Sequence, residues 1–522
     1  MPSLPMHSKL LAALAATALA AGVTTATMAS PALAATAADS TTTAKAAAYV
    51  ATRLTSVGTV QGSFQDDKGN SVTFTDWGRT LDAALALLAA GGQDATLGRT
   101  LTSVEDPTAV KAYTQGAPGD KPDAAYVGAT AKLAFVVAAT GGNPRDVGGI
   151  DLIAQLTSLE TPEGRFADRS SFGDFANVFG HAFAVLALQQ AGQTVPDTLV
   201  QGLLGARCPD DGSFPETYPK AGTPCTGSVD ATGLALQALA AVGQGGSQQA
   251  QAAVTWLTGQ QRDDGSFPGQ AAVNSTGYAV LGLNAVGAPT DNAITYLTGQ
   301  QNGDGGLRRG PNTDSVSDLF ATSQALPALA GTTFVASARS IRRQATLILD
   351  RTSIVATGTA VATVHAPANS VVDLVAYSRP STTFTVVRTA TVGATGVVTW
   401  KIGPLSNTRL YAQERGAAAT PQTVLNVAPG LSLSATRTGT RTYVFSGSSI
   451  PARTGGLVIS LYRFTDATHS VLTAQTKADP KTGKWSLRRT FTGTGQFSFV
   501  VLTRGDLQNV AGSSATRSVR IA

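Results

Sequence analysis

The sequence predicts a multidomain chain in which an all-α part, a double ring of paired helices, precedes an all-β part of two sandwich domains. Two observations predict this order. Ala- and Leu-rich segments that end in Gly recur at a regular spacing as far as Gly331. Val- and Thr-rich stretches of alternating polarity follow Ser340. The 522 residues are far more than a single hydrophobic core needs, so several domains are expected.

The first 34 residues predict a signal peptide. Lys9 precedes the apolar run LLAALAATALAAG, which is too short to span a bilayer, and Ala32-Leu33-Ala34 supplies small residues for signal peptidase. The mature chain would begin at Ala35. The alternative is a buried Ala-rich helix. We expect no transmembrane segment, because no later stretch reaches 18 uninterrupted apolar residues, and no terminal wall-sorting motif is present.

The charge changes sign along the chain. Residues 1–331 carry a net charge of −10 and residues 332–522 a net charge of +15. A basic module accumulates on polyanions, and export argues against nucleic acid as that partner. We therefore expect a secreted protein, extracellular or cell-wall associated, with an anionic cell-wall polymer or another surface molecule as its partner.

The two cysteines, Cys208 and Cys225, lie in the loop CPDDGSFPETYPKAGTPC. In an oxidising compartment we expect them to pair as a disulfide. The alternative, a catalytic thiol, would need a histidine, and none is near in the sequence.

A spacing recurs five times in the acidic part, with Leu followed at +8 by Gly and at +10 by an apolar residue. The copies are Leu54, Gly62, Phe64; Leu156, Gly164, Phe166; Leu204, Gly212, Phe214; Leu257, Gly265, Phe267; and Leu297, Gly305, Leu307. A sixth unit lacks the loop but keeps the segment that follows it.

Each loop is followed by an apolar segment of about a dozen residues ending in Gly, such as TGLALQALAAVG. These segments predict helices that are buried on most sides. More amphipathic helices, such as QAQAAVTWLTGQQ, precede the loops. Six units, each an outer helix, a loop and an inner helix, would close into a double ring over residues 35–340.

The pattern aromatic-Leu-x3-Gln-x3-Gly-x-aromatic resembles the QW repeat of squalene–hopene and oxidosqualene cyclases. It is more loosely similar to the repeats of protein prenyltransferase β subunits and transcobalamin-like proteins. The resemblance covers about residues 45–331 and implies an α6/α6 toroid. Phe or Leu stands where the cyclase motif has Trp, and only Gln261 and Gln301 match its Gln. We expect these two side chains to bind free backbone groups at helix ends.

The chemistry of these families is not matched by the sequence. Cyclases protonate an alkene with the middle Asp of DxDD, and the aligned stretch is Ser228-Val229-Asp230-Ala231-Thr232, which keeps only Asp230. The zinc ligands of prenyltransferases and the CGEQ-like thioester sequence are also missing. Whether the protein is an enzyme is left open, with no catalytic residue assigned beyond the candidate Asp230. An N-terminal helix residue that complements the helix dipole is the alternative role for Asp230. We expect no cofactor and no metal, since the paired loop acids such as Asp263 and Asp264 are typical of solvated turns.

A binding site is the remaining hypothesis. All inner helices of a toroid begin at the same end, so five polar residues should cluster around one mouth. They are Asp76, His181, Asp230, Asn274 and Asp318. His181 takes the place of Thr in other repeats and is expected to face the interior, with a hydrogen-bonded core role as the alternative. Below the mouth we expect an apolar, Ala- and Leu-lined channel for a hydrophobic ligand with a polar or cationic end, or else a ring filled by its own side chains.

The basic part predicts two immunoglobulin-like β-sandwiches, 341–428 and 429–522, because two sets of strands align on each other. Trp400 and Trp485 fall in matching strands as core anchors. The pair resembles the tandem β-modules of exported actinobacterial proteins. Plain solubility is the alternative role of their charge.

Together these features predict a secreted, cell-envelope-associated binding or scaffold protein. Its toroid would hold a hydrophobic ligand or a partner, and its β-modules would associate with the anionic wall. Two alternatives stay open. One is an exported terpene cyclase- or prenyltransferase-like enzyme that uses Asp230. The other is a corrinoid binder similar to transcobalamin.

Overall fold

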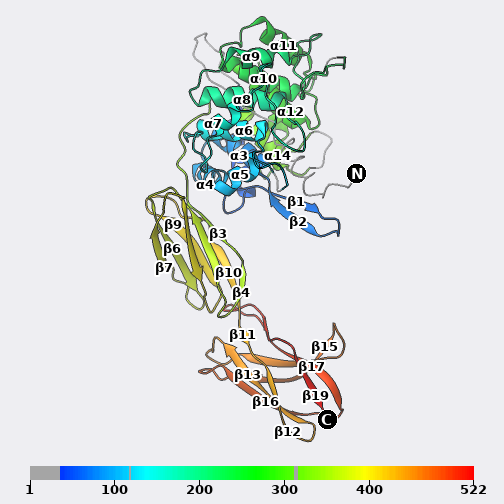
Figure 1. Ribbon diagram of the computed structural model, residues 1–522, viewed down its shortest axis with the longest axis vertical. Helices are drawn as coiled ribbons and strands as arrows, with labels where there is room; N and C mark the ends of the chain where they lie inside the picture. The colour runs from blue at the N-terminus through cyan, green and yellow to red at the C-terminus, as the bar shows by residue number, and fades with distance from the viewer. Residues whose placement is uncertain (1–35, 117–118, 221, 311–314) are drawn as a thin grey trace. The chain divides into compact units, whose positions relative to one another are not determined.

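The computed structural model describes residues 36–116, 119–220, 222–310 and 315–522 (Figure 1). The predicted signal peptide, residues 1–34, lies outside the described residues. The chain forms two compact units, Met1–Gln344 and Ala345–Ala522. The first is mainly helical and the second is built from β-strands, which confirms the predicted order of an all-α part before an all-β part. No described helix is long and apolar enough to cross a bilayer.

Six inner helices form a closed ring. Each contacts the next along the chain, and the last contacts the first. The six are α3 (Trp77–Ala90), α6 (Val127–Ala139), α8 (Val178–Gln190), α10 (Val229–Ala241), α12 (Ala272–Ala285) and α14 (Leu319–Leu329). Glycine lets some of them approach closely, because a Cβ on Gly233 of α10 would lie 2.3 Å from the carbonyl oxygen of Tyr278 on α12. The inner helices are buried almost all round, as their composition predicts.

Shorter helices cover the outside of this ring. They are α2 (Ser40–Arg53), α4 (Asp94–Val104), α5 (Pro107–Thr114), α7 (Leu152–Thr157), α9 (Asp197–Gly205), α11 (Gln248–Gly259) and α13 (Asp291–Gly299). Each packs on one or two inner helices. In α11 the buried residues are Ala250, Ala253 and Leu257, which lie on one face at helical spacing. The outer helices are therefore amphipathic, as predicted.

The repeated glycine positions the loop between an outer and an inner helix. Gly265 has φ +86° and lies so close to α13 that a Cβ would be 2.3 Å from the carbonyl oxygen of Asn292. The next apolar residue, Phe267, is buried and donates its backbone N–H to the Thr276 hydroxyl of α12 at 2.9 Å. Gln261 donates to the Gly265 carbonyl oxygen at 3.1 Å. In this repeat the loop thus ties α11 to its inner helix α12 and to the following outer helix α13.

The first copy of the repeat lies four residues earlier than predicted. Gly58, with φ +81°, packs against Thr100 of α4, and the Val60 N–H donates to the Thr80 hydroxyl of α3. Gly62 and Phe64 instead belong to a hairpin of β1 (Gln61–Gln65) and β2 (Ser71–Thr75). The assignment of Gly62 and Phe64 to the repeat was therefore wrong. A hairpin follows the glycine that has the loop geometry of the other repeats, and this hairpin carries a second, accidental match to the spacing.

The interior of the ring differs from the predicted apolar channel. Each inner helix places a side chain at the same level of the ring, two residues after the position that holds Thr in five helices and His181 in α8. These side chains are Asp82, Lys132, Phe183, Leu234, Tyr278 and Gln324. All are almost fully buried. Lys132 donates to Asp82 Oδ1 at 2.7 Å and to the Gly78 carbonyl oxygen at 3.2 Å. An ion pair and large side chains therefore fill this level, where Ala and Leu were expected.

The segment after α14 packs against the ring. Phe334 is 1% exposed, and its N–H lies 3.5 Å from Gln237 Oε1 of α10. Arg343 donates to the Glu105 carboxylate and to the Thr140 carbonyl oxygen. The helical unit therefore includes these residues and ends at Gln344, whereas the predicted domain ended at 340.

The first part of the β unit has its core between two sheets. One sheet has the order β4-β10-β9-β6-β7 and the other β3-β5-β8. The strands are β3 (Thr346–Leu349), β4 (Ser353–Val355), β5 (Ala360–His365), β6 (Val371–Ser378), β7 (Thr385–Thr391), β8 (Val397–Ile402), β9 (Thr408–Glu414) and β10 (Thr423–Ala428). Leu347 and Val364 of one sheet join Leu374 and Leu410 of the other in the core, and Trp400 packs against it half-buried.

The second part repeats this arrangement around an aromatic core. One sheet holds β11-β13-β12 with β16, and the other holds β15-β14-β17-β18 with β19. The strands are β11 (Gly430–Leu431), β12 (Ser434–Gly439), β13 (Thr442–Ile450), β14 (Val458–Phe464), β15 (Ser470–Lys477), β16 (Lys484–Thr490), β17 (Gly495–Thr503), β18 (Gly512–Ser513) and β19 (Arg517–Ile521). Phe445 and Phe499 lie 4.8 Å apart between ring centroids, and Trp485 is buried with them.

Candidate functional site

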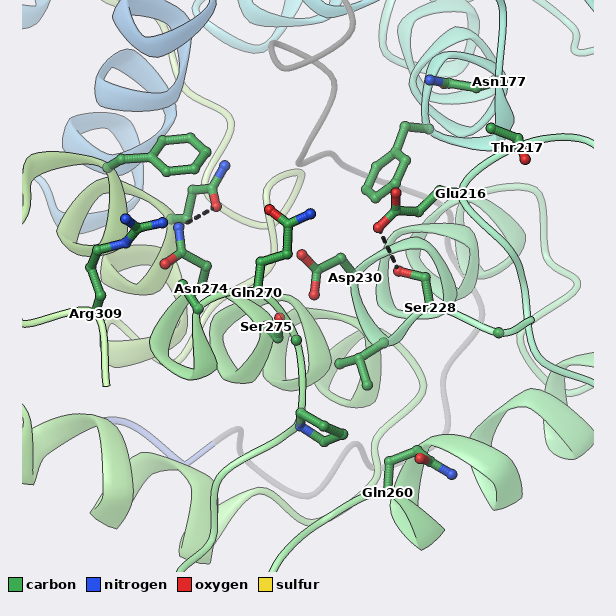
Figure 2. Close-up of a pocket in the computed structure, with 18 of the residues that line it drawn as sticks. Asn177, Glu216, Thr217, Ser228, Asp230, Gln260, Gln270, Asn274, Ser275 and Arg309 are labelled. Carbon is green, nitrogen blue, oxygen red and sulfur yellow. Dashed lines mark hydrogen bonds between the residues drawn. The ribbon is translucent and has the colours of Figure 1, made fainter. Parts of the chain in front are cut away.

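A cavity of about 720 Å³ lies where the inner helices begin (Figure 2). Its walls come from the first turns of α8, α10, α12 and α14, from the start of α3, and from the loops after α9 and α11. The volume is within the range of small-molecule sites, roughly 300 to 1,000 Å³. The ring thus presents side chains from five inner helices to one space.

One register of the inner helices supplies the floor of the cavity. The residue two positions before the loop-binding Thr, or before His181, faces it in four helices: Phe179, Asp230, Asn274 and Phe320. Equivalent positions on equivalent helices point the same way, so this register was the sequence signal for the site. It was only partly recognised, because Asp318 was aligned with Asp230 in place of Phe320.

Asp318 belongs to the capping register, four residues before the loop-binding Thr. Its carboxylate accepts the Ala321 N–H at 2.7 Å, as Asp76 accepts the Arg79 N–H at 3.0 Å. Asp76 also lines the cavity, but Asp318 is not among the lining residues. The structure therefore brings together Asp76, Asp230 and Asn274 of the five predicted residues. Their role in binding stays a prediction.

His181 lies outside the cavity, and the expectation that it faces the interior was wrong. Its ring is fully buried, with Nδ1 3.0 Å from the Tyr218 hydroxyl and Nε2 2.9 Å from the Leu199 carbonyl oxygen on α9. The loop-binding register points outward, so His181 replaces the Thr hydroxyl and holds Tyr218 beside the Phe166 N–H. Burial lowers the pKa of His181 to about 4.

Asp230 stands in the first turn of α10 with a partly exposed side chain that lines the cavity. Burial raises the pKa of Asp230 to about 6; a hydrogen bond from the Ser275 hydroxyl opposes the shift, and the nearby negative charge of Glu216 adds to it. About half of this carboxyl is therefore protonated at pH 6 and about a tenth at pH 7.

Glu216 enters the cavity from the loop closed by Cys208 and Cys225. Their disulfide, with Cα atoms 5.5 Å apart, confirms the predicted pairing. Ser228, at the start of α10, donates to Glu216 Oε1 at 3.4 Å. The sequence had drawn attention to this loop only for its cysteines. The disulfide thus shapes one wall of the site.

Asn274 contributes an unused acceptor. Its side-chain nitrogen donates to Gln324 Oε1 at 2.7 Å, while its Oδ1 has no hydrogen-bond partner among the described residues. The residue is only 4% exposed. Of the 17 buried side-chain nitrogen and oxygen atoms without a partner among the described residues, this oxygen is the one that belongs to a residue lining the cavity, so a ligand or a water molecule there is its candidate donor.

The two arginines that line the cavity do not neutralise Asp230 or Glu216. Arg79 pairs with Asp76 at 3.5 Å, and its guanidinium lies 5.2 Å from the Phe320 ring centroid. Arg309 is exposed to solvent. No ion pair within the described part of the chain joins a Lys or Arg to Asp230 or Glu216. The carboxylates are uncompensated by a cation.

Within the described ranges, no group of three or more His, Cys, Asp or Glu side chains is arranged to hold a metal ion. Aromatic side chains complete the wall. Phe179 packs edge-on against Tyr278 with ring centroids 6.4 Å apart, and Trp256 of α11 is half-buried. The cavity therefore combines aromatic surfaces with a majority of polar groups.

Comparisons with known proteins add little to this geometry. No family model matches the sequence, and no curated protein matches it. Among solved structures, that of a type II terpene cyclase from Scytonema is similar with a TM-score of 0.41 and 17% sequence identity. The similarity covers 56% of this chain and 96% of that one.

Proposed function

We propose that this is an extracellular binding protein: the helical toroid holds a polar small molecule in the cavity, and the basic β-modules attach it to an anionic polymer of the cell envelope. The observation that carries the binding role is the Asn274 Oδ1 atom, buried at the cavity wall without a partner. A buried acceptor left unbonded costs about 1 to 3 kcal/mol, and a ligand that donates to it removes that cost.

The cavity walls favour a polar ligand over the elongated apolar one that the sequence predicted. Carboxylates, amides and hydroxyls outnumber the apolar side chains of the lining. Below them the ring level of Lys132 and Asp82 is filled. An apolar tail would have to displace a buried ion pair, which is unfavourable.

The charge of the β unit supports attachment to a polyanion. Residues 345–522 hold 18 Lys and Arg and six Asp and Glu, and residues 429–522 hold 12 and three of these. Lys484, Arg488 and Arg489 of β16 are exposed. A surface of one sign concentrates a polyanion by long-range attraction that salt weakens.

The binding role is tested by native mass spectrometry of the protein purified from the medium of its own source. We expect a small molecule to be carried into the gas phase and released on unfolding. Asn274→Leu, which removes the acceptor, should lose it, while Asn284→Leu on the same helix should keep it. Protein that is ligand-free at all stages of a gentle purification, and that binds no polar small molecule afterwards, would contradict the proposal.

Attachment is tested with the full chain on isolated cell envelope at low and high salt. Replacing Lys484, Arg488 and Arg489 by Ser should weaken binding at low salt and reduce its salt dependence. The control replaces Lys68, Lys111 and Lys121 of the helical unit by Ser. Equal loss from both triple variants, or binding that salt does not change, would contradict attachment through the β-modules.

A second candidate is an exported enzyme that uses Asp230 as an acid. The observation in its favour is the pKa of about 6, which keeps part of this carboxyl protonated at neutral pH inside a cavity. The test is a mass-spectrometric product assay with polyprenyl substrates. A cyclised product that Asp230→Asn abolishes would establish the enzyme and displace the binding role.

A further inference from the structure

The polar wall of the cavity presents hydrogen-bond acceptors that lack donors. In the view of Figure 2, Asp230 of α10 and Glu216 of the disulfide loop lie on one side of Gln270, and Asn274 of α12 lies on the other side with its side-chain oxygen toward Arg309. The side-chain nitrogen of Asn274 already donates to Gln324, so the side-chain oxygen is the atom that can accept a further hydrogen bond. Within the described residues, the hydrogen bonds that the two carboxylates accept come from Ser275, for Asp230, and from Ser228, for Glu216. An ionised carboxylate has about four acceptor sites, so both retain capacity.

We infer that the cavity recognises a primary ammonium group on a small polar molecule, with Asp230 and Glu216 as its acceptors and the Asn274 side-chain oxygen as an acceptor for a donor on the body of that molecule. This inference rests on the proposed binding function and names the class of ligand. An ammonium group brings three N–H donors and one positive charge. It therefore supplies both N–H donors and a cation to the two carboxylates.

The surroundings of the carboxylates make a cation favourable. The charged and titratable groups around Asp230 are Glu216, Asp76, Arg79, Arg309 and Tyr278. Of the two cations, Arg79 is engaged by Asp76, and Arg309 is exposed. None of the interactions that act on Asp230 comes from a positive charge. Asp230 is partly exposed and Glu216 is exposed, and a cation that enters between two neighbouring carboxylates stabilises the charged form of both.

Aromatic rings support the same ligand. Trp256 and Phe179 line the cavity, and a cation near the face of an aromatic ring is stabilised. A neutral donor such as an alcohol would gain neither the cation–π attraction nor the ion pair. A quaternary ammonium would gain the charge but has no N–H to donate to the two carboxylates.

The rest of the cavity suits hydroxyl or amide groups on the body of the ligand. Gln260, Gln270, Asn177 and Thr217 all line it and can both donate and accept. A primary amine on a polyhydroxylated ring and an amine at the end of a short amide chain share this chemistry. Glucosamine and the ε-amine of Nα-acetyl-lysine amide are suitable probes of the two sources.

The experiment is isothermal titration calorimetry of the full chain at pH 7. The probes are glucosamine, N-acetylglucosamine, glucose, Nα-acetyl-lysine amide and choline. The variants are Asp230→Asn and Glu216→Gln, which keep shape and remove charge. Asp197→Asn, at the exposed start of α9, is the matched control. Circular dichroism confirms that each variant is folded.

We expect at least one primary amine to bind, with N-acetylglucosamine, glucose and choline at least tenfold weaker. Either cavity substitution should weaken the amine at least tenfold, and Asp197→Asn should not. Glucose binding as tightly as glucosamine would overturn the ammonium inference while leaving the binding function intact. Amine binding that neither cavity substitution changes would overturn it too. Failure of every probe, together with ligand-free native protein, would overturn the binding function itself.

Discussion

Lys132 and Asp82 form an ion pair in the middle of the helical ring, with Nζ 2.7 Å from Oδ1 and side-chain exposures of 0% and 2%. They come from adjacent inner helices, α6 and α3, and occupy the same register. Lys132 also lies 5.9 Å from the centroid of the Phe183 ring. The pair joins α6 to α3 at the level where buried side chains fill the interior of the ring.

Breaking this pair from one side should destabilise the helical unit strongly. Lys132→Met leaves a buried, unpaired carboxylate and is expected to cost about 3 to 5 kcal/mol in the free energy of unfolding. The double variant Lys132→Met with Asp82→Leu should recover most of the loss, because both charges are gone. Urea unfolding followed by the helical circular dichroism signal measures both. A double variant as unstable as the single one would show that packing, not charge, dominates here.

Replacing Gly265 by Ala should destabilise the helical unit more than replacing Gly259, a glycine of the same repeat. Gly265→Ala places a Cβ in a left-handed conformation and against the carbonyl oxygen of Asn292, so a loss of about 2 to 3 kcal/mol is expected. Gly259→Ala, at the end of α11 with open space around it, should change stability little. Thermal unfolding of both variants makes the comparison. Similar losses from the two would mean that the close approach of loop and α13 is not required.

The titration of Asp230 should lower the free energy of unfolding of the helical unit as pH rises. Its pKa is raised from 3.8 to about 6 on folding, so between these values the folded state binds more protons than the unfolded state. The stability it adds is fully present below pH 3.8 and is lost as pH rises through 6. Relative to Asp230→Asn, the wild-type protein should lose about 2 kcal/mol between pH 4 and pH 7, below the full shift because the group is partly exposed.

The measurement is urea unfolding of both proteins at pH 4, 5, 6 and 7, with Asp197→Asn as the control. Parallel stability curves for wild type and Asp230→Asn would contradict the raised pKa.

Loss of the disulfide should open the cavity wall without unfolding the ring. The bridge closes a 17-residue separation, which is worth about 3 kcal/mol in the chain-entropy model. The Cys208→Ser, Cys225→Ser double variant should keep its helical signal and bind the amine probes more weakly, because Glu216 lies on the released loop. Thiol labelling of both cysteines in the native, unreduced protein would show that the bridge is absent. Unchanged amine affinity in the double variant would show that the position of the disulfide loop does not affect binding at the site.

The sequence predicted the ring of helices better than it predicted the faces of those helices. Leu257, Gly265 and Phe267 mark a loop because their spacing follows from one packing geometry. Gly62 matched the spacing by chance, since a hairpin follows the true glycine, Gly58. The orientation of His181 could not be read from its place among Thr residues, because helices buried all round give no amphipathic signal.

The site was predicted in part for a related reason. Asp76, Asp230 and Asn274 were found because all inner helices begin at one end of the ring. Glu216 was missed because a disulfide loop without secondary structure brings it there, and no periodicity describes such a loop. The pairing of Lys132 with Asp82 joins different helices 50 residues apart in sequence, and only the closed ring brings them together.

The most direct test of the account is the number of protons released when an amine binds. At pH 6 the Asp230 carboxyl is about half protonated in the free protein, given its pKa of about 6. Titration calorimetry with the ε-amine of Nα-acetyl-lysine amide, repeated in buffers of different ionisation enthalpy, measures this number, because that amine stays fully protonated at pH 6. The account predicts release of roughly half a proton by the wild-type protein and none by Asp230→Asn. Binding without proton release, or equal release by the variant, would contradict it.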